Sequence, residues 1–481
     1  MPRTAIVWFR RDLRLADNAA LTEALAQAEG VAALFVLPAL GVAHAPGAAS
    51  RAWLAASLKA LAADLSARGG ALAVREGPVA GAVAAAASEC GATLVTCTRD
   101  WTPAGLAEER EVADALSEAG VELRVAEGQL LVAPKSLKTV TGSGYRIFTP
   151  YWSSWRRAWR AEEPLAAPAH VPTPEHTLET GPTRTRNRLY AKLTAGVPTE
   201  PGALDLATHW SPGEAGAHAR LGEFVRDGLA GYEVARELPA EHGTSELSPH
   251  LAWGEISPRQ VVHAVAKLEG ANAFMRQLAW REFAYHVLHT HPTTLDEPLR
   301  PEFSAMVWRD DPDALEAWRA GQTGFPLVDA GMRQLAQTGW MHNRVRMVAA
   351  SLLAKDLLVA WQDGAHAFTE MLVDIDPPLN AFNWQWVAGS GADAAPYFRI
   401  FNPALQGQRY DPLGDYVRHW VPELAKVPAQ WLHRPEQAPK TQLKAAGVVL
   451  GKAYPLPIVD RAAARMRALA AFSAMREGRR T

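Results

Sequence analysis

The pattern of apolar and polar positions divides the chain into two halves of different character. In the first half, short apolar runs alternate with alanine-rich stretches at helical spacing. The alternation of buried strands and helices predicts a doubly wound, parallel α/β sheet. The predicted strands are residues 4–9, 32–37, 71–74 and 93–96, and the predicted helices between them are 49–68, 79–90 and 106–119.

From about residue 213 onward the apolar residues recur at helical spacing and strand signals are scarce. This pattern predicts an all-α assembly, with helices at 271–289, 326–337 and 343–359, large enough to surround a sizeable cofactor. Residues 161–212 are rich in Pro, Thr and Ala without a sustained period, which indicates a connector, and 461–481 predict a short, solvated basic helix. We therefore expect an α/β domain over residues 1–130, a linker over 131–212 and a helical catalytic domain over 213–481.

Composition narrows the class of protein. The 481 residues contain no apolar run long enough for a transmembrane helix, and the first residues lack the features of a signal peptide. Two cysteines, Cys90 and Cys97, make neither a disulfide framework nor a zinc site, which predicts a cytoplasmic protein without a metal. The formal net charge is −2, so any nucleic-acid binding must come from a local basic patch. We expect a monomer.

Side chains that are candidates for binding or catalysis are most concentrated between residues 339 and 403. Three blocks there, GWMHNRVRM, VDIDPPLNAFNWQW and DAAPYFRIFNP, combine aromatic, amide, carboxylate and arginine groups. Buried polar groups are costly unless they are paired or bind something, so the blocks predict a lined pocket. The first predicted strand is followed by Arg10, Arg11 and Asp12 rather than by a glycine-rich dinucleotide fingerprint.

These blocks resemble the flavin-binding half of the photolyase/cryptochrome family. The runs AIVWFRRDLRLADNAAL, TSELSPHLAWGEISPR and WREF resemble other parts of that family, in the same order, over about residues 5–420. The resemblance is strongest to bacterial photolyases that repair cyclobutane pyrimidine dimers, in the branch near plant cryptochromes. It implies a reduced FAD cofactor and an N-terminal α/β antenna domain joined to a helical FAD-binding domain.

The resemblance also implies which residues hold the flavin. Spacing alone favours an ordinary helix N-cap for Thr244 to Ser248, but the resemblance implies phosphate binding there. It implies an Arg346–Asp374 ion pair beside the ring, although a structural salt bridge is the plain alternative. The implied flavin contacts are Tyr232, Thr244, Ser245, Glu246, Leu247, Ser248, Phe274, Gln277, Arg281, Asn343, Arg346, Asp374, Asp376 and Asn380.

Two substitutions within the resemblance bear on the reaction. Asn380, at the position that faces flavin N5, is not a strong proton donor, which favours repair over signalling. Gln277 stands where dimer photolyases usually have glutamate, so we expect slower splitting without loss of binding. The (6-4) photolyases also carry glutamine there, but they use histidines at the positions of Asn343 and Met347, and His342 is expected on another helix face. Trp280, Trp386, Met347 and Asn343 would hold the extruded dimer.

Three further sets of residues follow from the resemblance. Trp308, Trp361 and Trp384 occupy the positions of an electron-transfer chain, although three core tryptophans are the alternative. A basic rim for UV-damaged DNA, single- or double-stranded, is expected from Arg236, Arg344, Arg399, Gln406 and Arg409. His44 is a candidate contact for an antenna pigment, 5,10-methenyltetrahydrofolate or a deazaflavin, although a lone histidine after a strand is more often a loop residue than a ligand.

The sequence therefore predicts light-driven repair of cyclobutane pyrimidine dimers. The alternatives are a cryptochrome-type blue-light photoreceptor, a (6-4) photolyase and a flavoprotein that binds DNA without repair. Because the chain ends soon after the family domain, without a long extension, the prediction leans away from the photoreceptor.

Overall fold

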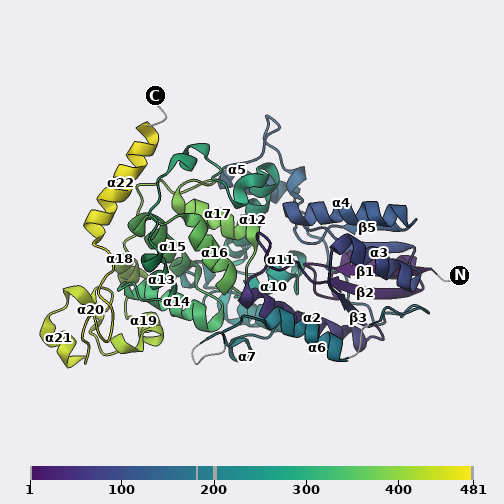
Figure 1. Ribbon diagram of the computed structural model, residues 1–481, viewed down its shortest axis with the longest axis horizontal. Helices are drawn as coiled ribbons and strands as arrows, with labels where there is room; N and C mark the ends of the chain where they lie inside the picture. Colours follow the sequence, from purple (N-terminus) through teal and green to yellow (C-terminus); the bar gives the residue numbers. More distant parts are fainter. Residues whose placement is uncertain (1–2, 180–182, 199–202, 478–481) are drawn as a thin grey trace.

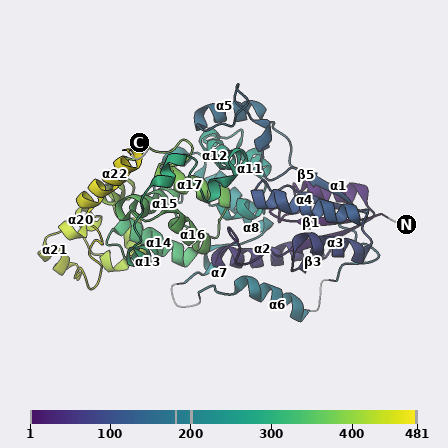
Figure 2. The same ribbon diagram turned by 45° about the horizontal axis from the view of Figure 1, so that its top comes forward.

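The computed structural model describes residues 3–179, 183–198 and 203–477, and it joins an α/β part to a larger helical part (Figures 1 and 2). Five parallel strands form one sheet in the order β3-β2-β1-β4-β5. The predicted fold class is confirmed. The strands are β1 (Thr4–Phe9), β2 (Gly30–Val36), β3 (Leu72–Arg75), β4 (Leu94–Thr98) and β5 (Glu122–Ala126).

Helices cover both faces of this sheet because successive strand residues point to opposite sides. Ala5, Val7 and Phe9 of β1 pack with α1 and α2, whereas Ile6 and Trp8 pack with α3 and α4. The two apolar layers make β1 a fully buried central strand, as its continuous apolar run predicts. The helices are α1 (Ala19–Gln27), α2 (Ala48–Ser66), α3 (Val79–Cys90) and α4 (Pro103–Glu118).

The segment predicted as a connector contains helices. It includes η1 (Pro134–Ser136), α5 (Phe148–Ala158), α6 (Thr183–Thr194) and α7 (Leu206–His209). The prediction of an irregular 161–212 was wrong in this respect. Tyr190 and Leu193 of α6 are buried in the same cluster as Trp53 of α2, so α6 is stabilised by packing against α2 rather than by its own composition.

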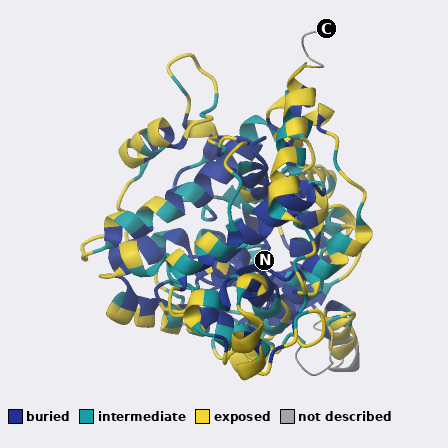
Figure 3. Cartoon of the chain, turned by 90° about the vertical axis from the view of Figure 1, so that its left-hand side faces the viewer, coloured by how far each residue is buried: buried dark blue, intermediate teal, exposed yellow. Residues whose placement is uncertain are grey.

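The helical part contains several packed apolar clusters, and its helices turn buried stripes inward and exposed stripes outward (Figure 3). Its first elements are α8 (Glu214–Glu223), the π-helical η2 (Phe224–Gly228), α9 (Tyr232–Ala235), α10 (Ser248–Trp253), α11 (Pro258–Val265), α12 (Ala271–Thr290), η3 (Pro292–Leu295), η4 (Pro301–Ala305) and α13 (Pro312–Arg319). They are followed by α14 (Pro326–Thr338), α15 (Asn343–Ser351), the π-helical η5 (Leu352–Leu357), α16 (Trp361–Met371), α17 (Pro377–Ala388), α18 (Pro403–Tyr410), α19 (Asp415–Trp420), η6 (Pro422–Leu424), α20 (Ala429–Leu432), η7 (Pro435–Gln437), α21 (Lys440–Ala445) and α22 (Arg461–Glu477).

Two predicted helices differ in detail from the observed ones. The helix predicted over 343–359 changes to π-helical geometry at Leu352 and stops before Leu358, whose φ of 59° is left-handed. The helix predicted at the C-terminus is α22, which is not solvated all round: it buries Ala464, Ala468 and Met475. Residues 478–481 of that prediction lie outside the described residues.

Contacts between distant segments fix the two parts against each other. Trp53 Nε1 of α2 donates to Glu255 Oε1 at 3.0 Å, and Arg14 donates to the carbonyl of Gly254 at 2.9 Å. Leu13 N donates to the carbonyl of Trp253 at 3.1 Å. Among the helices of the described residues, none is both long and apolar enough to cross a membrane.

Candidate functional site

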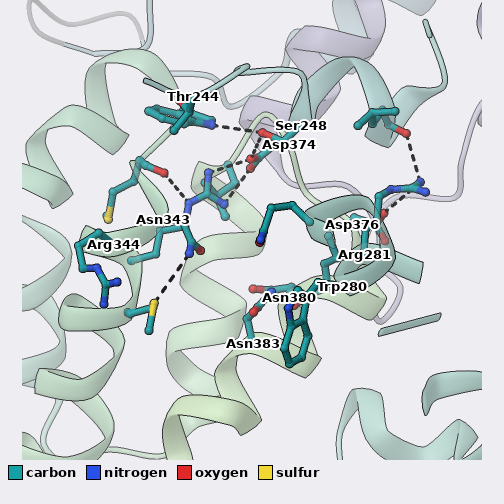
Figure 4. A pocket seen from close by; sticks show the side chains of 18 of the residues that line it. Thr244, Ser248, Trp280, Arg281, Asn343, Arg344, Asp374, Asp376, Asn380 and Asn383 are labelled. Carbon is teal, nitrogen blue, oxygen red and sulfur yellow. Dashed lines mark hydrogen bonds and ion pairs between the residues drawn. The ribbon is translucent and has the colours of Figure 1, made fainter. Parts of the chain in front are cut away.

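A cavity of about 540 Å³ lies in the helical part, between α10, α12, α15 and α17 (Figure 4). All of the residues predicted from sequence to contact a flavin line this one cavity, although they come from segments spread over more than a hundred positions. Trp280, Met347 and Trp386, predicted to hold a substrate, line it as well. The cavity is within the size range of cofactor and ligand sites.

Arg346 and Asp374 form a two-point ion pair on the cavity wall. Arg346 donates to the two carboxylate oxygens of Asp374 at 3.2 and 2.8 Å, and its Nε donates to the carbonyl of Met341 at 2.7 Å. Ser248 Oγ donates to Asp374 at 2.7 Å and accepts from Trp340 Nε1 at 3.2 Å. Because both charges are paired, the wall is rigid and locally neutral before anything binds.

Asp376 is held differently, and it leaves an acceptor free. Its Oδ2 accepts from the Tyr285 hydroxyl at 3.0 Å and lies 3.7 Å from the Arg281 guanidinium. Its Oδ1 is buried and has no hydrogen-bond partner. Burial raises the pKa of Asp376, although the positive charges of Arg281 and Arg11 oppose that rise. The unpartnered oxygen is a site for an N–H donor of a bound group.

The segment from Thr244 to Ser248 forms one end of the cavity. The alternative of an ordinary N-cap does not hold, because Leu247 occupies the N-cap of α10 and no side chain caps that helix. Glu246 has a φ of 50°, and its carboxylate lies 3.3 Å from Arg220. Hydroxyls and backbone N–H groups gathered at one turn suit an anionic group.

Asn380 presents an oriented amide. Its Nδ2 donates to the carbonyl of Ala365 at 2.9 Å and to Thr369 Oγ1 at 3.3 Å. The nitrogen is therefore engaged, and the carbonyl oxygen is the group that remains for the cavity. One turn further along α17, Asn383 also lines the cavity (Figure 4).

The predicted substrate residues form another part of the lining. Trp280 stacks on Phe148 of α5, with ring centroids 3.6 Å apart and planes 8° from parallel. Asn343 Nδ2 lies 3.8 Å from Met347 Sδ, so these two residues share one helix face as expected. Gln277 lies one turn before Arg281 and Trp280 on α12 and also lines the cavity.

His342 does not line the cavity. It is buried, and its Nδ1 accepts from the N–H of Arg344 at 3.2 Å at the start of α15. Burial lowers its pKa to about 4, so the ring is neutral near pH 7. A neutral, buried imidazole that does not line the cavity cannot protonate a bound substrate.

The three tryptophans of the predicted electron-transfer chain belong to one apolar cluster and differ in exposure. Trp384 is buried and lines the cavity, Trp361 is equally buried but does not line it, and Trp308 is partly exposed at the edge of the cluster. Gly364, one turn after Trp361, lets α16 approach Trp384: a Cβ there would lie 2.1 Å from the indole.

The predicted basic rim divides into two groups. Arg236 and Arg344 line the cavity, and both pair with the carboxylate of Glu237. Arg344 and Arg409 both lie over the ring of Tyr410, at 4.4 and 5.1 Å. The structure does not bring the other three into the cavity: Arg399 and Arg409 are exposed outside it, and Gln406 is half-buried on α18.

His44 lies far along the chain from the cavity residues and does not line the cavity. It is exposed, has a φ of 59°, and its Nε2 lies 3.2 Å from the carboxylate of Asp296 in the helical part. The ring therefore bridges the two parts of the chain.

Sequence reasoning missed several lining residues, and three of these carry side chains that donate or accept hydrogen bonds. Trp340 lies within the quoted block GWMHNRVRM, and Asn383 follows Asn380 at helical spacing, so both signals were present. Glu237 had no signal, because its importance comes from pairing with Arg344, which is distant in sequence.

Comparisons with known proteins agree with this geometry. Residues 5–173 match the family model described as DNA photolyase, and residues 274–474 match the FAD binding domain of DNA photolyase. The chain is 45% identical to the deoxyribodipyrimidine photo-lyase of Agrobacterium fabrum, over 98% of both chains. It is 34% identical to cryptochrome-2 of Arabidopsis thaliana, over 99% of this chain and 80% of that one. The crystal structure of a bacterial class III photolyase from Agrobacterium tumefaciens superposes with a TM-score of 0.94 at 43% identity, covering 99% of this chain and 98% of that one.

The fold and the cavity thus define a flavoprotein of the photolyase and cryptochrome type. The chain belongs to the DNA photolyase family, and it has that family's FAD-binding domain. The cavity residues fit such a cofactor: the unpartnered Asp376 Oδ1 suits an N–H donor of the ring, and the hydroxyls of 244–248 suit its phosphates.

Proposed function

We propose that this protein repairs cyclobutane pyrimidine dimers in DNA by light-driven electron transfer. The observation that carries the proposal is that the flavin-fitting wall and the aromatic residues Trp280 and Trp386 line the same cavity. An extruded dimer has flat apolar faces and polar edges, which suit such a lining. Relatives of similar length that are named deoxyribodipyrimidine photo-lyase support the same activity.

When bound, reduced FAD would supply the excited-state electron that opens the dimer. The residues of the chain would hold both partners. Arg346 and Arg281 place guanidinium N–H groups in the cavity lining, and these would favour an anionic reduced flavin even though each arginine also has an aspartate partner. The Asn380 oxygen can only accept a hydrogen bond, so it offers no proton to the ring. Gln277, Asn343 and Met347 would orient the dimer without delivering a proton.

The dimer is favoured over the (6-4) photoproduct as substrate. Repair of the latter needs a positioned acid, and the cavity has Asn343 and Met347 where that acid would be expected. The nearby His342 is buried and neutral at pH 7. A cryptochrome-type photoreceptor remains the second candidate because the chain is 34% identical to a plant cryptochrome.

The decisive experiment uses the purified full chain with its flavin reduced. Illumination with blue light at neutral pH should convert a dimer-containing oligonucleotide to intact pyrimidines, and a (6-4)-containing oligonucleotide should remain unchanged. If neither lesion is repaired although the flavin is present and reduced, the result would contradict repair and favour the photoreceptor. The dark reaction is the control.

Other features of the protein are part of the same proposal. We propose that residues 1–130, 131–212 and 213–481 act as antenna domain, linker and catalytic domain, in a cytoplasmic monomer. The antenna would be a folate or a deazaflavin near His44, whose contact with Asp296 supports a position between the two parts. Trp384, Trp361 and Trp308 would return the flavin to its reduced form, in keeping with their shared apolar cluster, in which Trp384 lines the cavity and Trp308 is partly exposed.

A further inference from the structure

Helix α5 carries a row of aromatic side chains that reaches the cavity wall. Phe148, Trp152, Trp155 and Trp159 recur at helical spacing along and just beyond α5. Their rings follow one another with centroids 6.4, 5.3 and 6.1 Å apart and planes within 22° of parallel. At one end, Phe148 stacks on Trp280 at 3.6 Å, so the position of α5 is tied directly to the cavity lining.

The outer face of this row is basic. Arg156 lies 5.6 Å over the ring of Trp152, and Arg276 of α12, one turn before Trp280, lies 5.4 Å over the ring of Phe148. Arg157 and Arg160 are also exposed at the end of α5. Stacking on a ring holds a guanidinium flat and leaves its N–H edge for an anion. We call Arg156, Arg157, Arg160 and Arg276 the α5 surface.

These four arginines lack carboxylate partners within the described ranges, 3–179, 183–198 and 203–477. The acidic groups close by are engaged elsewhere: Glu162 lies 3.0 Å from Arg259, and Glu163 lies 3.5 Å from His263. Asp393 accepts from the N–H of Phe148, at the opposite end of α5 from Arg156 and Arg157.

Across the cavity the charges are arranged differently, because Arg236 and Arg344 share the carboxylate of Glu237. In a chain of net charge −2, the α5 surface is therefore a local excess of unpaired positive charge beside the cavity.

We propose that the α5 surface binds the phosphates of the DNA that flanks the lesion on one side of the cavity. This inference rests on the proposed repair function and assigns it an additional substrate contact. The 11 residues of α5 span about 16 Å at the usual helical rise. Phosphates follow one another by about 3.4 Å along each strand of a duplex, so the surface can contact four or five of them. Such contacts position DNA without reading its sequence.

The test compares two triple variants of the full, flavin-loaded chain. One is Arg156→Gln/Arg157→Gln/Arg276→Gln, which spares Arg160 because that side chain also caps α5 by donating to three carbonyls. The matched control is Lys440→Gln/Lys444→Gln/Lys452→Gln, which removes equal charge from exposed residues at and near α21. Binding of a dimer-containing duplex is measured against salt concentration.

The arginine variant should bind at least about tenfold more weakly near 0.1 M salt, and its salt slope should fall by about two to three, since each phosphate contact contributes about 0.9. The lysine variant should match the unmodified protein. The difference in affinity between the arginine variant and the unmodified protein should disappear when the duplex is trimmed on one side of the dimer. It should persist when the duplex is trimmed on the other side.

Equal affinity and slope for the arginine variant and the unmodified protein, within about twofold, would overturn the inference. An equal loss of affinity on both trimmed duplexes would contradict the inference that the α5 surface contacts DNA on only one side of the cavity. Flavin absorbance per protein shows that the variants are folded. Failure of the unmodified protein to repair dimers would instead contradict the proposed function. In that case the salt dependence of binding would still show whether the α5 surface binds DNA.

Discussion

Phe148 and Trp280 stack face to face, with ring centroids 3.6 Å apart and planes 8° from parallel, although α5 and α12 are far apart in sequence. Trp280 lines the cavity, and Phe148 lies behind it without lining the cavity itself. The wall that would contact a substrate is thus held in place by a helix that precedes the helical part.

Replacement of this supporting ring should weaken substrate binding selectively. We expect Phe148→Leu to lower affinity for dimer-containing DNA about three- to tenfold, because aromatic pairs contribute about 0.5–1.5 kcal/mol beyond simple burial. Flavin content should be retained. Phe472→Leu is the control, because Phe472 stacks on Tyr397 at 4.5 Å and 8°. An equal loss of affinity in the control would show that only general stability matters.

Breaking the ion pair of the cavity wall should release the flavin. In Asp374→Asn, Arg346 loses its counter-charge, and removing one partner of a buried pair costs about 3–5 kcal/mol. Arg346 is partly exposed, so we expect a smaller effect, at least about a tenfold weaker flavin affinity. Flavin absorbance after dialysis measures it. Asp227→Asn breaks the exposed Arg226–Asp227 pair and should change nothing.

Loss of the middle tryptophan should separate photoreduction from repair. Trp361→Phe keeps the packing but removes an oxidisable indole, so light-driven reduction of oxidised flavin should slow by at least about tenfold. Repair by chemically reduced protein should be unaffected. Trp431→Phe, at a partly exposed tryptophan against the same apolar cluster, is the control. Normal photoreduction in Trp361→Phe would remove this residue from the electron path.

Gln277→Glu should raise the efficiency of dimer splitting. A carboxyl at this position can donate a proton as well as a hydrogen bond, whereas the amide donates only the latter. We expect the dimers repaired per absorbed photon to rise by about twofold or more, with binding little changed. Gln437→Glu is an exposed control with the same charge change. An unchanged or lower yield would contradict the role given to Gln277.

Acid should destabilise the protein in part through the buried His342. Burial lowers the pKa of His342 to about 4, whereas the unfolded value is 6.5. The unfolded chain therefore binds more protons between these values, and the free energy of unfolding falls as the pH drops from about 6.5 to 4. The difference between these two pKa values corresponds to roughly 3 kcal/mol when it is fully expressed.

His342→Asn keeps an oxygen that can accept from the N–H of Arg344 and removes the titration. Denaturant unfolding at pH 7 and pH 5 should therefore show a smaller pH effect in this variant. Burial also lowers the pKa of His286 to about 4. The fall in the free energy of unfolding that His286 causes at acid pH should therefore remain in the variant. An identical pH effect in the variant and the unmodified protein would show that His342 is not the source.

Much of the fold follows from local patterns. The strands β1 to β4 were predicted within about two residues because a strand buried on both faces needs a continuous apolar run. β5 was missed because its sequence, ELRVA, lies at a sheet edge and is only partly buried. α6 was missed because its stability comes from packing on α2, which no local period records.

The sequence by itself indicated a lined pocket at residues 339–403, because the polar, aromatic and amide groups of its quoted blocks have no stable place in an ordinary core. Its resemblance to a known family added the other predicted contacts. Only the tertiary structure decided how they are paired. Asp374 faces Arg346 while Asp376 keeps a free oxygen, Glu237 takes up Arg344, and Phe148 supports Trp280. These pairings join segments distant along the chain, and the geometry of such contacts is set by packing rather than by spacing.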